Sequence, residues 1–211
     1  MPAVARPANA SAARAGVAQA CRAEQVRHAS RMTDGETVLT TSRLGLVPAT
    51  SATITAELED AARLAKILDA ELAPDWPPEH HDSDTLRFWR DSLTRPGAAG
   101  WWLHYAVSLR SGSSTLVGSV GYKGPPKDGV VEIGYSVVPS WQRQGLATEA
   151  CRALIDSAWR RGTEVVVAHT LEGLEPSIGV LRKLGFSASA GPEPGVLAFT
   201  LRRREGWPNV A

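Results

Sequence analysis

The chain has 211 residues, enough for one domain with a sizeable core and too few to favour two. Its formal charge is +1, but residues 1–31 hold five arginines and one glutamate, whereas the remainder holds 18 basic and 21 acidic residues. The part expected to fold is therefore mildly acidic, which argues against nucleic-acid binding. No stretch approaches the roughly 20 apolar residues of a membrane span, so no membrane partner is expected.

The first 31 residues contain eleven alanines and no sustained apolar stripe. They fit a disordered extension, an upstream start with the working start near Met32, a weakly helical segment or an Arg-rich transit peptide, and the sequence does not choose among these. The apolar core of a secretory signal is missing. We expect residues 1–35 to be a disordered Ala/Arg-rich extension, 36–204 a folded domain and 205–211 a C-terminal tail.

Cysteine and histidine usage indicates neither a disulfide nor a metal site. Cys21 lies in the expected extension and Cys151 on the apolar face of a predicted helix, so a reduced, cytoplasmic setting is the default. His80 and His81 are the only adjacent histidines. Neighbouring histidines on a loop are more often solvated than ligating, and no metal is expected.

The first half begins with a strand followed by two helices. Residues 38–47 alternate enough to form a strand, and apolar residues at helical spacing predict a first helix over 54–72. The proline-rich segment 74–78 ends that helix. Asp82-Ser83-Asp84 can cap a second helix, which Pro96-Gly97 terminates.

Three strands joined by short turns come next. Residues 101–109 and 115–122 read as strands connected by a hairpin-like segment at 111–114. A Gly/Pro turn at 124–129 leads into the β-branched and aromatic run 130–138, which a proline ends. Strands joined in this way should pair antiparallel.

One carboxylate interrupts the third of these strands. Strand periodicity puts Glu132, Gly134 and Ser136 on one face, opposite Ile133 and Tyr135. The Glu132 side chain should therefore point at something polar or into a cleft.

A polar turn and an amphipathic helix follow that strand. Gly145 in the turn lacks the Cβ that would keep a ligand from the backbone. The unpaired N–H groups of the first helical turn carry partial positive charge, so the turn is a ready anion site. The apolar stripe of the helix comprises Ala147, Ala150, Cys151, Leu154, Ile155, Ala158 and Trp159, and Gly162 is a fitting stop.

The remaining elements are a strand, a helix and a strand. The valine-rich segment 164–170 predicts a buried strand, 176–184 a short helix and 196–201 a final strand. The step from strand 130–138 through its helix to the valine strand should be a parallel, right-handed crossover.

Two segments resemble the GNAT acyltransferase superfamily. Residues 142–147, Gln-Arg-Gln-Gly-Leu-Ala, match its Q/R-x-x-G-x-G/A pattern between a V-E-I-G-Y strand and an A-T-E-A helix start. That helix start is common in the branch resembling ribosomal-protein N-terminal (alanine) acetyltransferases. Residues 176–186 resemble the second cofactor-flanking helix with its L-G-F ending. The resemblance covers roughly residues 36–204.

The resemblance implies a mixed α/β (α+β) GNAT fold, β-α-α-β-β-β-α-β-α-β, with a mostly antiparallel, splayed central sheet. Relatives hold the pantetheine arm of acyl-CoA where the two parallel strands splay. By that likeness, backbone groups of Val137 and Val138 would contact pantetheine. The N–H groups of residues 143–148 would hold the pyrophosphate, and Arg143 would add a charge-assisted contact. The full set of cofactor-binding residues in this turn would be Gln142, Arg143, Gln144, Gly145, Leu146, Ala147 and Thr148.

Acetyl transfer to an amine needs a proton acceptor, because an ammonium group cannot attack a thioester. A carboxylate positioned to take that proton typically accelerates the reaction about 10²–10⁴-fold. The resemblance puts a carboxylate of this role at the position of Glu132; the alternative is an ion-pairing residue that shapes the strand and the mouth of the cleft.

Two positions near the second helix depart from the family pattern. Leu181 stands where many members have a tyrosine that protonates the CoA thiolate, and Leu174 stands where the branch usually has asparagine. Ser177 would hydrogen-bond the sulfur region, as in some relatives, or cap the helix.

The acceptor site should form from the loop 76–82, the loop 190–195 and the Glu132 face of the sheet. Trp76, His80 and His81 are candidates to line it; a proline-stiffened loop around a packed tryptophan explains them equally well.

The preferred function is transfer of an acetyl group from acetyl-CoA to a primary amine of a small molecule or a protein N-terminus, by a cytoplasmic monomer or homodimer without a metal. The alternative is a GNAT-like sensor or interaction module that binds acyl-CoA without turnover. A dinucleotide-binding Rossmann unit ranks far below, because the chain has no G-x-G-x-x-G.

Overall fold

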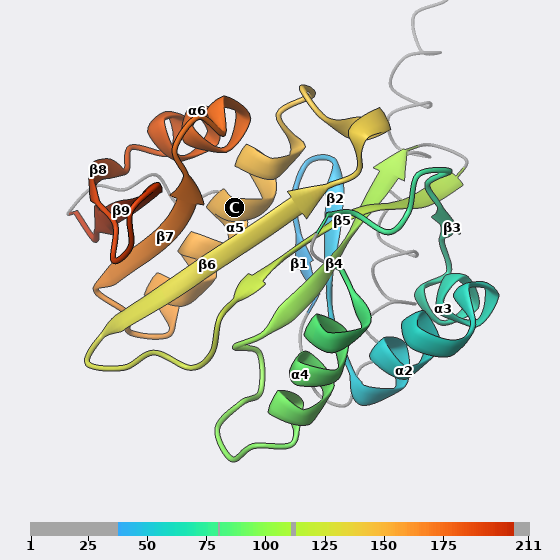
Figure 1. Ribbon diagram of the computed structural model, residues 1–211. Coiled ribbons are helices and arrows are strands. Elements are labelled where there is room, and N and C mark those ends of the chain that lie inside the picture. Colours follow the sequence, from blue (N-terminus) through green and yellow to red (C-terminus); the bar gives the residue numbers. More distant parts are fainter. Residues whose placement is uncertain (1–37, 80, 111–112, 205–211) are drawn as a thin grey trace, which may run out of the picture.

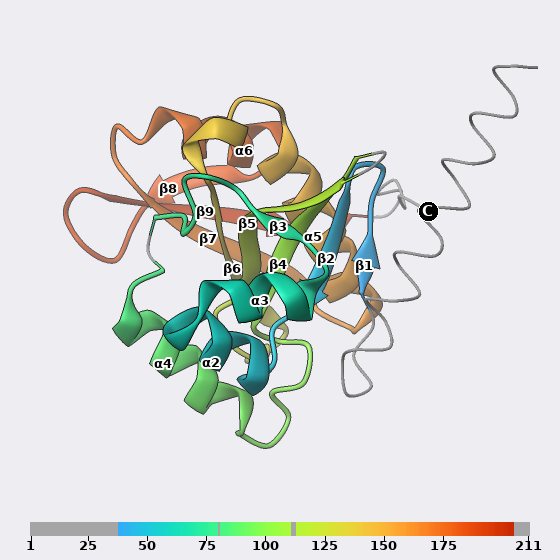
Figure 2. The same cartoon turned by 90° about the vertical axis from the view of Figure 1, so that its right-hand side faces the viewer.

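The computed structural model describes residues 38–79, 81–110 and 113–204. Its centre is a mixed sheet in the order β1-β2-β4-β5-β6-β7-β9-β8, with β3 paired to β5. Helices α2, α3 and α4 cover one face of the sheet and α5 and α6 the other (Figures 1 and 2). The predicted mixed α/β class with a mostly antiparallel sheet is confirmed. The predicted extension 1–35, with Cys21, and the tail 205–211 lie outside the described residues.

The predicted first strand is wrong in one respect, because it is a hairpin. Strand β1 (Leu39–Thr40) pairs antiparallel with β2 (Leu44–Pro48). Thr41 turns the chain: its hydroxyl oxygen accepts a bond from the Leu44 N–H at 2.9 Å, and its own N–H donates to the Leu44 carbonyl at 2.8 Å. Alternation of residue types alone does not reveal such a turn.

The predicted first helix is also two helices. Helix α2 (Ser51–Glu59) ends at Asp60, whose carboxylate caps α3 (Ala61–Leu68) by accepting the N–H groups of Ala62 and Arg63. A capping aspartate starts a new helix with a new axis while it preserves the apolar spacing. A two-residue strand, β3 (Glu71–Leu72), then runs parallel to β5.

The next four elements follow the prediction closely. Asp82 caps α4 (Ser83–Leu93) as expected. Strands β4 (Leu103–Arg110), β5 (Ser113–Tyr122) and β6 (Val130–Val137) pair antiparallel in sequence order. Part of the predicted β4–β5 turn, residues 111–112, lies outside the described residues.

After a short 3₁₀ turn at Pro139–Trp141, α5 (Leu146–Arg160) crosses to β7 (Val165–Leu171), which is parallel to β6 as predicted. Helix α6 (Glu175–Lys183) and the antiparallel pair β8 (Ser187–Ala190) and β9 (Val196–Arg202) complete the sheet. Strand β8 was not predicted, since its sequence Ser-Ala-Ser-Ala is exposed and carries no large apolar residue.

Two apolar cores lie on opposite faces of the sheet. The larger packs α5 and α6 against the strands and contains Cys151, Leu154, Ile155, Leu181 and Phe199. The smaller packs α2, α3 and α4 against β2, β4 and β5, and contains Ile54, Leu64, Leu86 and Tyr105. Cys151 is fully buried, as predicted, and burial raises the pKa of its thiol.

The two ends of strand β6 pair with different strands. Residues 130–132 pair with 165–167 of β7, whereas residues 133–137 pair with 118–122 of β5. Beyond Glu132 and Val167, β6 and β7 have no ladder between them. The sheet therefore opens between β6 and β7 toward the carboxyl ends of these strands, beside α6 (Figure 1).

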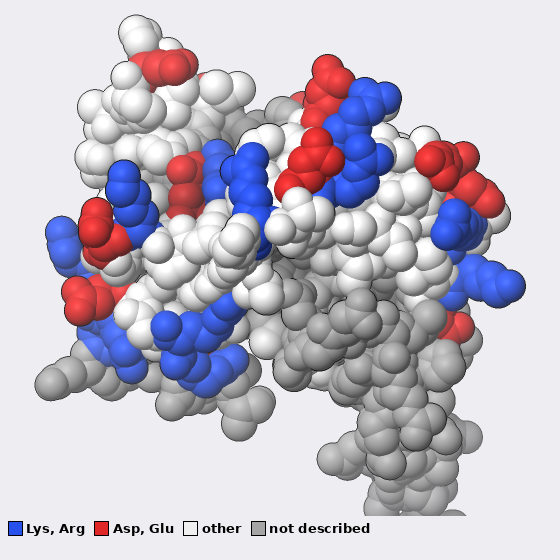
Figure 3. Space-filling view, turned by 90° about the horizontal axis from the view of Figure 1, so that it is seen from below, with Lys and Arg blue, Asp and Glu red and all other residues white. Residues whose placement is uncertain are grey.

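On the described part of the face seen in Figure 3, Lys and Arg side chains are interspersed with Asp and Glu, with uncharged surface between them. None of the helices in the described part of the chain combines the length and the apolar character needed to cross a membrane.

Candidate active site

The turn between β6 and α5 has a backbone shaped for an anion. Arg143 and Gly145 both adopt left-handed conformations, with φ of 60° and 79°. Gly145 is the N-cap of α5, and no side chain caps the helix there. The first-turn N–H groups therefore remain available to a ligand, with the positive end of the helix dipole behind them.

Side chains from distant segments hold this turn in place. The Gln142 side-chain amide donates to the Val137 carbonyl at 2.8 Å, which closes the turn onto the end of β6. From the β1–β2 connection, Arg43 Nη1 donates to the Gln144 carbonyl at 2.8 Å and Arg43 Nε contacts Glu149 Oε2 at 2.6 Å. Arg43 is a site residue that sequence reasoning missed, because no local pattern links positions so far apart.

Glu149 in the first turn of α5 would by itself oppose an anion at this end of the helix. Its carboxylate accepts bonds from the hydroxyls of Thr41 and Ser42 and from Arg43. Burial acts to raise the pKa of Glu149, but the bonds from Thr41 and Arg43 outweigh it, so the pKa lies below its ordinary value. The Arg43 guanidinium offsets the negative charge that results.

The β6 backbone presents an unpaired edge to the opening. The Val138 N–H donates to Val117 of β5 at 3.0 Å, and the Val138 carbonyl accepts from Trp141 at 3.0 Å. Neighbouring residues of a strand direct their backbone groups to opposite sides, so Val137 faces the opening. Its carbonyl is the one held by Gln142, which leaves its N–H directed toward the β7 side.

Glu132 lies at the last paired position of β6 and β7, where the opening begins. Its Oε1 contacts Lys123 Nζ at 2.5 Å and His169 Nδ1 at 3.0 Å. Burial acts to raise its pKa, but the hydrogen bonds from Lys123 and His169 outweigh that effect and the pKa lies below its ordinary value. The structure thus places Glu132 on the predicted face and in an ion-pair cluster.

Ser177 does not cap α6. The N-cap position is Leu174, and no side-chain cap bond is present there. The Ser177 hydroxyl instead lies 3.0 Å from the Tyr135 hydroxyl, which also donates to the Ser177 carbonyl at 3.1 Å. This contact joins β6 to α6 across the opening. The Leu181 side chain is fully buried in the core, whereas Leu174 is exposed.

His81 is not the solvated loop residue expected of an adjacent histidine pair. Its Nδ1 lies 2.9 Å from Glu57 Oε1, and its Nε2 lies 2.7 Å from Ser119 Oγ. Glu57 Oε2 accepts the Tyr105 hydroxyl at 2.7 Å. The side chains of His81 and Glu57 are 1% and 4% exposed. His80 lies outside the described residues.

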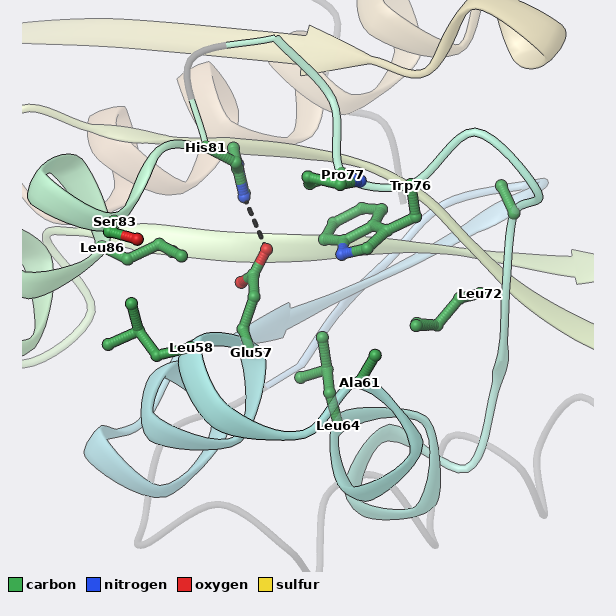
Figure 4. A pocket seen from close by; sticks show the side chains of 11 residues that line it. Glu57, Leu58, Ala61, Leu64, Leu72, Trp76, Pro77, His81, Ser83 and Leu86 are labelled. Atoms are coloured by element: carbon green, nitrogen blue, oxygen red, sulfur yellow. Dashed lines mark hydrogen bonds and ion pairs between the residues drawn. The ribbon is translucent and has the colours of Figure 1, made fainter.

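A cavity of about 300 Å³ adjoins this cluster (Figure 4). Trp76 and Pro77 form one side of it, and His81 and Glu57 point toward each other at its polar end. The remaining lining is mainly aliphatic and includes Leu58, Ala61, Leu64, Leu72 and Leu86. Apolar walls with a few convergent polar groups are typical of small-ligand sites.

The loop that carries Trp76 is tied to the turn after β6. The Asp75 carboxylate accepts the Ser140 N–H at 2.8 Å and the Ser140 hydroxyl at 2.7 Å, and these bonds lower the pKa of Asp75. The predicted acceptor loop is therefore next to the segment that leads from β6 into α5. The loop 190–195 lies beside the end of β7, where the Gly195 carbonyl accepts the Glu172 N–H at 2.8 Å.

No group of three or more His, Cys, Asp or Glu side chains arranged to hold a metal ion occurs among residues 38–79, 81–110 and 113–204.

Comparison with protein families decides the family of this chain. The acetyltransferase (GNAT) domain matches residues 52–187, well over half of the chain. The chain belongs to the GNAT acetyltransferase family. A comparison with curated proteins found no significant match.

Solved structures support the GNAT fold. The acetyltransferase from Agrobacterium tumefaciens superposes on this GNAT domain with a TM-score of 0.54 at 16% identity, over 81% of this chain and 97% of that one. RimL, described as a ribosomal L7/L12 alpha-N-protein acetyltransferase in complex with coenzyme A, superposes with a TM-score of 0.54 at 19% identity. The match covers 78% of this chain and 97% of RimL. At these identities the likeness concerns the fold alone.

Proposed function

We propose that this GNAT domain transfers an acetyl group from acetyl-CoA to a primary amine, borne by a small molecule or a protein N-terminus, by direct attack of the amine on the thioester. The observation that carries the proposal is the divergence of β6 and β7 beside the uncapped first turn of α5. A long ligand with amides in its arm and phosphates at its end fits these two features together.

On the donor side, the N–H groups from Arg143 to Thr148 are proposed to hold the pyrophosphate, and the Arg143 guanidinium to add a charge-assisted contact. The Val137 N–H is proposed to bond the pantetheine arm. Val138 would contact that arm without donating, because its N–H is used by β5. Gln142 and Gln144 would act mainly by fixing the turn through their bonds to Val137 and Arg43.

At the thioester end, the Tyr135 and Ser177 hydroxyls are proposed to hydrogen-bond the sulfur region. They come together where β6 and α6 face each other across the opening. Burial raises the pKa of Tyr135, so its hydroxyl stays a donor at neutral pH. A thiol pKa near 8.5 makes the thiolate a tolerable leaving group, and the loss of a tyrosine at Leu181 is then compatible with turnover.

On the acceptor side, we propose that the amine lies over the Glu132 face of β6 and that its body enters the cavity beside Trp76 and His81. Gly134 leaves room there, because a Cβ at that position would have only Lys123 within 4 Å, at 3.9 Å. The aliphatic cavity walls favour an acceptor with an apolar side chain next to its amine.

RimL, which shares the fold, is described as an alpha-N-protein acetyltransferase, and the proposal therefore includes a protein N-terminus as one form of the acceptor to be tested. A small amine with an apolar body suits the same cavity. An acceptor panel that contains both, with acetyl-CoA as donor and CoA thiol release as readout, tests the proposal. Release above the acceptor-free rate is the expected result; absence of acetyl-CoA binding by calorimetry would contradict it.

A second candidate is an acyl-CoA-binding module without turnover. Leu181 is buried in the core and cannot act on the sulfur, and Leu174 offers an exposed aliphatic side chain where the branch usually has asparagine. Tight acetyl-CoA binding with no thiol release across the panel would favour this candidate over the transferase.

A further inference from the structure

We propose that His81 takes the proton that the acceptor amine loses, by way of the Ser119 hydroxyl, and that Glu57 positions the imidazole for this role. The proposal rests on the acetyl transfer proposed above and concerns the proton which that reaction must remove from nitrogen.

The geometry is a continuous chain of hydrogen bonds from the sheet to α2. Ser119 Oγ lies 2.7 Å from His81 Nε2, and His81 Nδ1 lies 2.9 Å from Glu57 Oε1. A hydroxyl, an imidazole and a carboxylate in this order form a proton relay: the carboxylate fixes the ring and stabilises the imidazolium that forms. The Tyr105 hydroxyl donates to Glu57 and holds the carboxylate in turn.

Packing fixes the imidazole in this orientation. The ring meets Trp76 edge-on at a centroid distance of 5.4 Å and Trp89 at 5.1 Å. The Glu57 side chain is only 4% exposed. Burying a carboxylate costs free energy unless hydrogen-bonding partners compensate it, and His81 and Tyr105 are the partners of Glu57 here. A histidine with only a structural role in the core needs no more than a neutral hydrogen-bond partner. His81 instead pairs with the Glu57 carboxylate, and both line the polar end of a cavity (Figure 4).

The outer end of the relay lies next to the face of β6 where we place the amine. Ser119 is directly opposite Ser136 in the β5–β6 ladder. Side chains of directly opposite residues share a face and lie about 4.5–5.5 Å apart at Cβ. Ser136 is partly exposed, and the open space over Gly134 is its neighbour on that face. Ser119 is diagonally across the ladder from Gly134, so an amine over Gly134 would lie between Ser119 on one side and Glu132 on the other.

Glu132 is the less suitable of the two proton acceptors. Its carboxylate is held by Lys123 and His169 at 2.5 and 3.0 Å. These bonds lower its pKa despite its burial, and a carboxylate with a lowered pKa is a weaker base. Its position at the last paired residue of β6 and β7 suits a different role, in which the ion pairs fix the point where the strands part.

The step balances without a further reactant. The amine nitrogen forms a bond to the thioester carbonyl carbon, and the carbon–sulfur bond breaks with its electron pair leaving on the CoA thiolate. The proton leaves nitrogen for Ser119 Oγ as the Ser119 hydroxyl proton moves to His81 Nε2. The imidazolium then returns a proton to solvent or to the thiolate.

This relay predicts a pH dependence of turnover. The groups that face the imidazole are the Glu57 carboxylate from α2, the Ser119 hydroxyl from β5 and the rings of Trp76 and Trp89, with Tyr105 from β4 behind Glu57. A proton relay through an imidazole works only while that ring can accept a proton, so turnover should rise as the pH is raised.

The test compares pH profiles of kcat at saturating acetyl-CoA for the wild type, His81→Gln, Ser119→Ala and Glu132→Gln, with an amine that the wild type accepts. His81→Gln should lower kcat about 100-fold, leave the acetyl-CoA KM unchanged and remove the rising limb. Ser119→Ala should lower kcat at least about 10-fold, and Glu132→Gln should keep the limb.

His104→Gln is the matched control. His104 is also buried, and burial, which outweighs its bond to the Trp102 carbonyl, lowers its pKa to about 4. It lies outside the relay, so its variant should retain kcat and the limb. Imidazole added to His81→Ala supplies a second measurement, because the vacated space adjoins the cavity; saturable recovery of kcat is expected.

The relay would be overturned if His81→Gln and Ser119→Ala kept the wild-type profile, or if Glu132→Gln abolished the rising limb. In either case the acetyl transfer itself would stand. Absence of thiol release by the wild type across the whole acceptor panel would instead remove the proposed function, and the relay with it.

Discussion

The guanidinium of Arg43 donates to the carbonyl oxygen of Gln144 at 2.8 Å, and this contact ties the β1–β2 hairpin to the turn in front of α5. The same side chain contacts Glu149 at 2.6 Å. The turn proposed to hold pyrophosphate is therefore shaped from outside as well as by its own sequence.

Replacement of Arg43 by alanine should weaken acetyl-CoA binding. The variant removes the guanidinium bond to the Gln144 carbonyl and the positive charge beside Glu149, next to the proposed anion site. We expect the Kd, measured by calorimetry, to rise at least about 10-fold, which corresponds to about 1.4 kcal/mol. Arg87→Ala removes an exposed arginine paired with Asp84 on α4 and should leave the Kd unchanged. Equal affinities for wild type and Arg43→Ala would refute the anchoring role.

Gly145→Ala should destabilise the fold. Gly145 has a φ of 79°, and the left-handed region costs other residues about 1–2 kcal/mol. We expect a loss of that size in the free energy of unfolding from urea titration. Gly179→Ala is the control within α6: its Cβ would meet nothing within 4 Å, and it should gain about 0.5–1 kcal/mol. A Gly145→Ala variant as stable as the wild type would contradict the assigned backbone conformation.

Glu149 should make part of the stability depend on acid pH. Its pKa in the fold lies below its ordinary value, so its contribution is present above that ordinary value and is lost as pH falls through the folded-state pKa. Glu149→Gln should be less stable than the wild type at pH 7 and lose less stability between pH 6 and pH 3. Thermal unfolding across this range measures both effects.

The exposed Glu193 provides the reference for that experiment. Glu193→Gln should follow the wild-type curve throughout. If Glu149→Gln followed it too, the bonds from Thr41 and Arg43 to this carboxylate would contribute nothing to stability.

Trp76→Ala should weaken binding of the acceptor amine and leave binding of acetyl-CoA unchanged. Trp76 forms one side of the cavity and contacts His81 edge-on. We expect the KM for an apolar amine to rise about 10-fold, with the acetyl-CoA KM unchanged, in steady-state assays of thiol release. Phe88→Ala removes a ring that is 51% exposed on α4 and should alter neither KM. A rise in both KM values for Trp76→Ala would indicate a general loss of structure.

The strand, turn and helix at 130–160 were predictable because their signals are local. The β-branched run, the glycine with a positive φ and the apolar stripe each act within a few residues. The same holds for the Asp82 cap of α4.

The features that the sequence did not reveal depend on contacts between distant segments. The burial of His81 follows from its bonds to Glu57 and Ser119, which are 24 and 38 residues away. Strand β8 consists of small exposed residues and exists because it pairs with β9. The break between α2 and α3 at Asp60 is a partial exception, because its signal is local. An aspartate can cap a new helix, but the apolar spacing continues across Asp60 and by itself predicts one helix.

The bonds that Asp75 accepts from Ser140 would link the binding of the two proposed substrates thermodynamically. Order imposed on the turn after β6 by acetyl-CoA would be shared by the loop that carries Trp76, so the amine would meet a loop that has already lost part of its freedom. Coupling of this kind is reciprocal: whatever factor acetyl-CoA adds to the affinity for the amine, the amine must add to the affinity for acetyl-CoA. The two sites would then fill cooperatively, and the degree of cooperativity would depend on a single carboxylate outside both of them.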